Sequence, residues 1–196
     1  MGLSIHYNGE FKKGASLSSM IEEVKDVAEL HNWEYHILED SFDEQAFGKK
    51  EHNQDLFGIC FTPPECETVF IAFLSNGRMS NAKLLNLYGE SKDEKEQEYL
   101  YMNFVKTQYV GIEIHKLIIH LFKYLNEKYF LNFTMQDEGE YWETGDEKLL
   151  QKNFKRYTDL IDGFANATEI FPMEEGEDYV AYFSRLAKRL QKKRGS

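Results

Sequence analysis

The alternation of apolar and polar positions near the start of the chain predicts a strand, a helix and a second strand. Residues 3–7 alternate in the way typical of a half-buried strand. Serines at 16, 18 and 19 offer an N-cap, and apolar side chains then recur at helical spacing to about Asn32. Residues 35–38 have the composition of another strand. This opening therefore predicts a βαβ-like unit.

The middle of the chain contains two dense apolar runs, at 56–61 and 68–74. Asn76-Gly77 follows the second run, and this dipeptide between apolar segments predicts a two-residue hairpin turn. Residues 79–88 are compatible with a strand or a helix, and 99–109 favour a strand. The polar stretches 39–55 and 90–98 are expected to be loops.

Helical spacing dominates the second half. Residues 110–129 have only one narrow polar stripe, which is typical of a buried central helix, and a strand is predicted at 130–135. Thr144 and Glu147 form a capping box for a helix from about 146 to 164. A last helix is expected at 177–193, with Tyr179, Phe183, Leu186, Ala187 and Leu190 as its buried stripe. The pattern predicts one α+β domain over residues 1–196, with a mixed sheet.

Composition narrows the class of protein. A chain of 196 residues suits a single domain, and no apolar run is long enough to span a membrane. The N-terminus lacks the features of a signal peptide, so we expect a soluble cytoplasmic protein that does not bind membranes. Cys60 and Cys66, the two cysteines, have neither zinc-site nor disulfide spacing. Glu65 and Glu67 are expected to raise the pKa of Cys66, which argues against thiol catalysis.

The net charge of −11 is unevenly distributed. Residues 185–196 carry six basic side chains and no acidic one, which leaves 17 basic against 34 acidic residues in 1–184. So acidic a body repels phosphate backbones, which counts against general nucleic-acid binding. The basic end is expected to complete a helix that begins with acidic residues, and a binding arm is the alternative.

His115 stands out because it lies on the apolar face of the 110–129 helix. A histidine there must be neutral or have a hydrogen-bond partner, so a core histidine is expected, with a catalytic or metal-binding role as the alternative. The sequence contains no phosphate-binding glycine loop, nucleophile elbow or His-Glu-x-x-His motif.

A second unusual feature is the segment 137–147, which we call the acidic turn. It carries six carboxylates in eleven residues, together with two glycines and the pair Tyr141-Trp142. A solvated loop is expected, because charge runs usually face water. Crowded carboxylates could also bind a divalent cation, for which Asp137 and Glu138 are the candidates. Trp142 could anchor a partner or ligand.

The two features are expected to meet. The 110–129 helix is followed almost at once by the strand at 130–135, and this short connection returns the chain alongside the helix. The end of the strand then passes His115, so we predict a hydrogen bond from its imidazole to Asp137 or Glu138.

Four segments resemble a group of uncharacterised bacterial proteins of unknown function. They are Ser4-Ile5-His6-Tyr7, Phe104-Val105-Lys106-Thr107-Gln108, the helix start Gly111–His115, and DEGEYWETGD at 137–146. The resemblance covers most of the chain. It implies a bacterial, cytosolic protein and brings no activity, cofactor or site residue with it.

Two main functions follow as hypotheses. The first is a binding protein without catalysis, in which Glu140, Tyr141, Trp142 and Glu143 contact a basic protein partner. The alternative is a metal-assisted hydrolase with Mg²⁺, Ca²⁺ or Mn²⁺, using His115 and the carboxylates of Asp137, Glu138, Glu140 and Glu143. An acidic mimic of nucleic acid is a third, weaker option. No cofactor is predicted, and the oligomeric state stays open.

Overall fold

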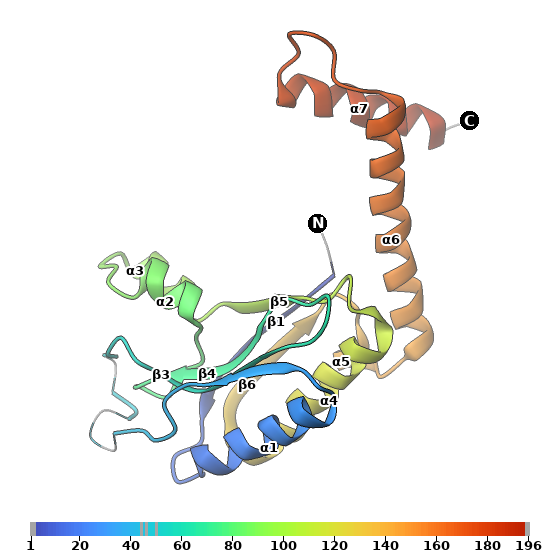
Figure 1. The fold of residues 1–196 in the computed structure, drawn as a ribbon. Coiled ribbons are helices and arrows are strands. Elements are labelled where there is room, and N and C mark those ends of the chain that lie inside the picture. The colour runs from blue at the N-terminus through green and yellow to red at the C-terminus, as the bar shows by residue number, and fades with distance from the viewer. Residues whose placement is uncertain (1–2, 44, 46, 50, 195–196) are drawn as a thin grey trace. The chain divides into compact units, whose positions relative to one another are not determined.

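The computed structural model describes residues 3–43, 45, 47–49 and 51–194, with the backbone alone for 190–194. The chain divides into two compact units, unit 1 (Met1–Phe154) and unit 2 (Lys155–Ser196). Both helices and strands are present, which confirms the α+β class (Figure 1). That 1–196 forms a single domain stays a prediction.

In chain order, the elements are β1 (Ser4–Phe11), α1 (Leu17–Leu30), β2 (Glu34–Ile37), β3 (Leu56–Thr62), β4 (Val69–Leu74), α2 (Ala82–Tyr88), α3 (Glu94–Tyr99), β5 (Asn103–Lys106), α4 (Gly111–Tyr129), β6 (Phe130–Asp137), α5 (Tyr141–Thr144), α6 (Glu147–Ile170) and α7 (Tyr179–Arg194).

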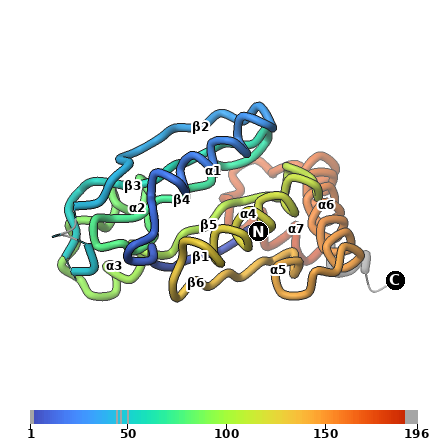
Figure 2. The backbone as a smooth tube through the Cα atoms, turned by 90° about the horizontal axis from the view of Figure 1, so that it is seen from below, coloured from blue at the N-terminus to red at the C-terminus, as the bar shows by residue number. Residues whose placement is uncertain are grey.

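The strands form two three-stranded antiparallel sheets, β5-β1-β6 and β2-β3-β4. The expected mixed sheet was therefore wrong. The order strand–helix–strand at the N-terminus is confirmed, but β1 and β2 lie in different sheets, so α1 links two sheets instead of two parallel neighbours (Figure 2). Alternation along a strand shows which side chains are buried, but it does not specify the neighbouring strand.

The hairpin after β4 has a three-residue loop, which corrects the predicted two-residue turn. The N–H of Gly77 donates to the C=O of Leu74 at 2.8 Å, and the N–H of Leu74 donates to the C=O of Arg78 at 2.9 Å. Gly77 alone takes the left-handed conformation, with φ +86°. This is the other common short hairpin, a turn followed by one left-handed residue.

Two further expectations about the middle of the chain were wrong. Part of the predicted loop 90–98 is helix α3, because the side chain of Asp93 caps its first N–H groups and acidic residues follow in the first turn. The strand predicted over 99–109 is limited to β5.

Helix α4 is the central buried helix, as predicted. Its buried residues pack on the sheet that contains β1, where the rings of Phe122 and Tyr7 lie 4.7 Å apart. Only one narrow face of α4 carries exposed charged groups. Helix α4 therefore holds the residues of its inner face, including His115, inside unit 1.

In unit 2, the buried stripe of α7 differs from the predicted one. Tyr182 and Leu186 are buried, whereas Phe183 is 46% exposed and Tyr179 is 71% exposed. The hydroxyl of Tyr182 donates to the C=O of Phe171 at 3.0 Å, which turns this face inward. The predicted side-chain position of Leu190 lies outside the described residues. Among the described helices, none is long and apolar enough to cross a membrane.

Candidate functional site

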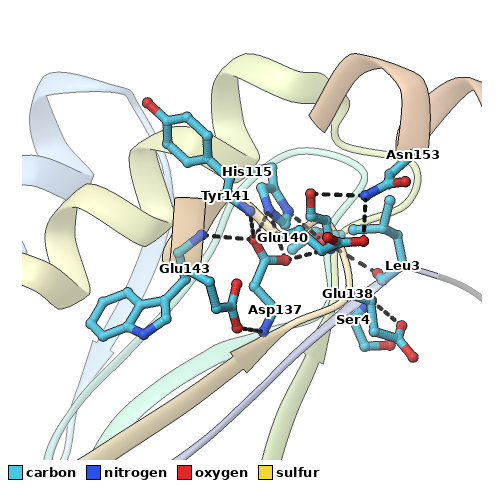
Figure 3. A network of polar contacts seen from close by, with 12 residues as sticks. Leu3, Ser4, His115, Asp137, Glu138, Glu140, Tyr141, Glu143 and Asn153 are labelled. Carbon is cyan, nitrogen blue, oxygen red and sulfur yellow. Dashed lines mark hydrogen bonds and ion pairs between the residues drawn. The ribbon is translucent and has the colours of Figure 1, made fainter. Parts of the chain in front are cut away.

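His115 and Asp137 form a buried pair where α4 passes the end of β6. The ring nitrogen Nε2 lies 3.1 Å from Oδ1 and 3.2 Å from Oδ2 of Asp137 (Figure 3). His115 is 0% and Asp137 3% exposed. The predicted hydrogen bond between His115 and the acidic turn is thus confirmed, with Asp137 as the acceptor.

The second nitrogen of the ring has a partner as well. Nδ1 lies 2.8 Å from the hydroxyl of Thr107, in the segment between β5 and α4. A hydroxyl can donate to or accept from an imidazole nitrogen, so both nitrogens of the His115 ring have a polar partner. The Thr107 hydroxyl also lies 3.3 Å from the C=O of Leu3, which accepts the Thr107 N–H at 2.8 Å. A chain of contacts thus runs from the start of β1 through α4 to the end of β6.

Asp137 also orders the start of α5. Its carboxylate accepts the N–H groups of Gly139 at 2.7 Å, Tyr141 at 2.8 Å and Trp142 at 3.2 Å. Burial by itself raises the pKa of this carboxyl group. The hydrogen bond and charge of His115, together with the backbone N–H groups, outweigh burial, and the pKa of Asp137 lies below its ordinary value. Asp137 is therefore held as a carboxylate.

The pair is closed on its remaining sides. A Cβ on Gly139 would lie 3.0 Å from Nε2 of His115 and 2.7 Å from Cδ1 of Leu150, so no side chain fits between the acidic turn and the histidine. The ring of Phe154 stands edge-on to the His115 ring, with centroids 5.4 Å apart. Asn153, also buried, donates to the C=O of Gly139 at 3.2 Å.

The neighbouring carboxylates contact other groups instead of gathering at one point. Glu138 accepts the N–H of Ser4 at 2.7 Å, and its own N–H donates to the C=O of Ser4 at 3.1 Å. Glu143 accepts the N–H of Asp137 at 3.1 Å, and Glu140 accepts from the side chain of Asn153 at 3.3 Å. Figure 3 shows these contacts around the buried pair.

The two aromatic residues of the acidic turn differ in exposure. Tyr141 is buried, and its hydroxyl lies 3.3 Å from Nε2 of His120. Trp142 is half-buried, with its ring edge-on to Phe133 at 5.7 Å and the ammonium group of Lys123 at 5.4 Å. Of the four residues predicted to bind a partner, Tyr141 therefore has no exposed side chain.

Thr107, His115 and Asp137 bring a hydroxyl, an imidazole and a carboxylate together, the groups that nucleophilic catalysis combines. Here, however, Thr107 is 0% exposed, and no substrate can reach its hydroxyl in this conformation. The arrangement fits a structural link between β1, α4, β6 and α5.

The same contacts occupy the atoms of His115, Asp137 and Glu138 that were candidate ligands for a cation. Both nitrogens of His115 have protein partners, and the oxygens of Asp137 and Glu138 accept from different backbone groups. Within the described part of the chain, no three His, Cys, Asp or Glu side chains are grouped so that they could hold a metal ion.

The predicted rise in the pKa of Cys66 is confirmed, but its main cause is burial, and of the two neighbouring glutamates only Glu67 contributes. Burial first, and the neighbouring Glu67 carboxylate second, raise the pKa of the Cys66 thiol to about 12. Its thiolate is therefore scarce at neutral pH, and thiol catalysis has no support.

Sequence reasoning missed Thr107 and Asn153 as members of this network. Asn153 had a detectable signal, because it lies beside Leu150 and Phe154 on the apolar stripe of α6, as His115 does on α4. Thr107 had none, since a threonine between a strand and a helix is common.

Comparison with protein-family models, with curated proteins and with solved structures finds no match to this chain.

Proposed function

We propose that this chain is a cytoplasmic bacterial binding protein without catalysis, and that the exposed side of its acidic turn docks a basic segment of a partner protein. The single observation that carries the proposal is a set of surface carboxylates without a cationic partner among the described residues. Glu140, Glu143 and Asp146 are exposed, and no described Lys or Arg forms an ion pair with any of them.

Rigidity supports this use of the surface. The backbone under the carboxylates is held by Asp137, whose three accepted N–H groups and His115 contact lie in the protein interior. A preordered surface loses less entropy on binding than a mobile loop does. The half-buried Trp142 adds an aromatic side chain next to the charges.

The test uses lysine-rich and glutamate-rich peptides of equal length as probes. Trp33 is buried, so Trp33→Phe leaves Trp142 as the sole tryptophan reporter. We expect the lysine-rich peptide to change Trp142 fluorescence saturably, the glutamate-rich peptide to have no effect, and added salt to weaken binding. Unchanged Trp142 fluorescence with the lysine-rich peptide contradicts the proposal.

A matched pair of double variants locates the binding surface. Glu140→Gln with Glu143→Gln removes two charges and keeps both hydrogen-bond acceptors, so binding should weaken with the fold intact. Glu94→Gln with Glu98→Gln removes two exposed charges from α3 and should leave binding unchanged. Equal losses in the two double variants would mean that only net charge attracts the peptide.

A further inference from the structure

The free edge of β6 differs from the other strand edges of unit 1. β6 is paired with β1 on one side only, and Figure 2 shows it at the outer margin of its sheet. Residues 130–136 of this strand, Phe-Leu-Asn-Phe-Thr-Met-Gln, include no charged residue and no proline. A β-bulge between Leu131 and Thr134, where Asn132 has φ +50°, limits the regular outer edge to residues 133–136. Native proteins usually protect a regular edge with charges, proline, a bulge or a covering segment, and residues 133–136 contain no charge and no proline.

The register of β6 shows which backbone groups face outward. Glu138 donates to Ser4 of β1 at 3.1 Å, while the N–H of Asp137 points away from β1 and donates to Glu143. Because an antiparallel strand alternates in this way, the N–H and C=O of Met135 and the C=O of Phe133 also point away from β1. For these three groups, the described residues provide no hydrogen-bond partner.

The other three strand edges of unit 1 are protected. Residues 78–80 cover the edge of β4, where the N–H of Leu74 donates to the C=O of Arg78 at 2.9 Å and the N–H of Ser80 donates to the C=O of Ala72 at 3.0 Å. On β5, the N–H of Lys106 donates to Glu67 at 2.9 Å and its C=O accepts from the Cys66 thiol, so the β3–β4 connection covers that edge. β2 has four residues, begins with Glu34 and is exposed throughout. A short charged edge disfavours pairing.

We propose that β6 pairs with β6 of a second copy of this chain, antiparallel and centred on Thr134, which joins two three-stranded sheets into one of six strands. The absence of charge in 130–136 selects this occupant, because a strand that pairs with itself brings each side chain close to its own kind. The proposal does not depend on the proposed function.

This register matches side chains on both faces of the sheet. Met135 of one copy lies opposite Phe133 of the other, so the N–H of Met135 donates to the C=O of Phe133 on each side of the two-fold axis. Both side chains are half-buried on the inner face, and a thioether beside an aromatic ring is a favourable contact. On the outer face, the exposed Thr134 lies opposite Thr134 of the second copy.

The test measures the mass of the full chain by light scattering and sedimentation equilibrium over a range of concentrations. The wild type should show a concentration-dependent dimer. Thr134→Lys and Thr134→Glu place like charges opposite each other, so each should raise the dimer dissociation constant by about fivefold or more. An equimolar mixture of the two variants should restore dimerisation, because the opposed charges then attract.

The control is Lys106→Glu, a change of exposed charge on β5 at the opposite edge of the same sheet, which should leave the dimer unchanged. Thr134 is exposed, so melting curves should show folded variants. A wild type that stays monomeric to about 1 mM overturns the proposal. A dimer that both Thr134 variants leave intact also overturns the proposal, because another surface then forms the dimer. A mixture of the two variants that stays monomeric overturns it as well.

Discussion

Protein groups around His115 form the hydrogen bonds that water would form with an exposed imidazole ring. Thr107 and Asp137 contact the two ring nitrogens, so the imidazole has no unsatisfied polar atom. Asp137 depends on the contact in turn, because a buried carboxylate without a partner is costly. The residues of this network therefore stabilise one another, and removing one leaves the others with an unpaired group.

His115→Phe should lower the free energy of unfolding by about 3–5 kcal/mol, because Asp137 and Thr107 lose their common partner inside the protein. Urea denaturation of wild type and variant measures the difference. His120→Phe, on the exposed stripe of the same helix, is the control and should change stability by less than about 1 kcal/mol. Equal effects would mean that the buried pair does not stabilise the fold.

The pH dependence of the unfolding free energy should reflect the ionisation of Asp137. Its pKa is lower in the folded protein than in the unfolded chain, so its contribution is full above the unfolded pKa, near 4, and is lost as the pH falls through the folded value. The difference in unfolding free energy between wild type and Asp137→Asn should be constant just above about pH 5 and shrink below about pH 4. A difference that grows on acidification would contradict this sign.

At the scale of elements, α5 depends on its surroundings. A four-residue helix is too short to form alone, and it is ordered by the carboxylate of Asp137 and by Glu140 in the left-handed conformation, with φ +61°. The sequence of the acidic turn resembles a solvated loop for this reason. The buried carboxylate of Asp137 and the left-handed backbone at Glu140 together order it as a helix.

The hairpin loop after β4 allows a test of the backbone conformation at Gly77. Gly77→Val should destabilise unit 1 by about 1 kcal/mol or more, because a β-branched residue resists positive φ. Gly77→Asn is the matched variant, since asparagine tolerates this conformation. Both add a Cβ that would lie 2.8 Å from the Phe47 ring, so their difference in melting temperature isolates the backbone effect. Equal melting temperatures would show that the contact with Phe47 dominates.

For α7, the buried stripe predicts an order of effects. Leu186 is 1% exposed, so Leu186→Ala should cost about 2–5 kcal/mol in the stability of unit 2. Phe183→Ala removes a side chain that is 46% exposed and should cost less than Leu186→Ala does. Amide exchange along α6 and α7 measures both changes. The reverse order would support the stripe predicted from spacing alone.

At the scale of the whole molecule, the buried network and both sheets belong to unit 1. A chain ending at residue 158 retains Asn153 and Phe154, so it should fold and keep the near-ultraviolet circular dichroism of Trp33 and Trp142. Loss of that signal would show that unit 1 needs residues 159–196 to fold. The same experiment tests whether residues 1–196 act as one domain.

The sequence by itself determined the helices α1, α4, α6 and α7, the strands β1 to β4 and β6, and the meeting of His115 with a carboxylate at the start of the acidic turn, Asp137 or Glu138. These follow from local periodicity and from one short connection between α4 and β6, which leaves the chain little freedom. His115 was detectable because a polar residue on an apolar face needs a partner.

Tertiary structure alone decided which strands pair, the burial of Tyr141 and the role of Thr107. Strand pairing joins segments far apart in the chain, and alternation does not encode the neighbour. Thr107 belongs to the network because β1, β5 and α4 converge on it. The side chain of Tyr141 is buried where its hydroxyl contacts His120 on α4. Such contacts depend on distances between elements, which no local pattern of residues carries.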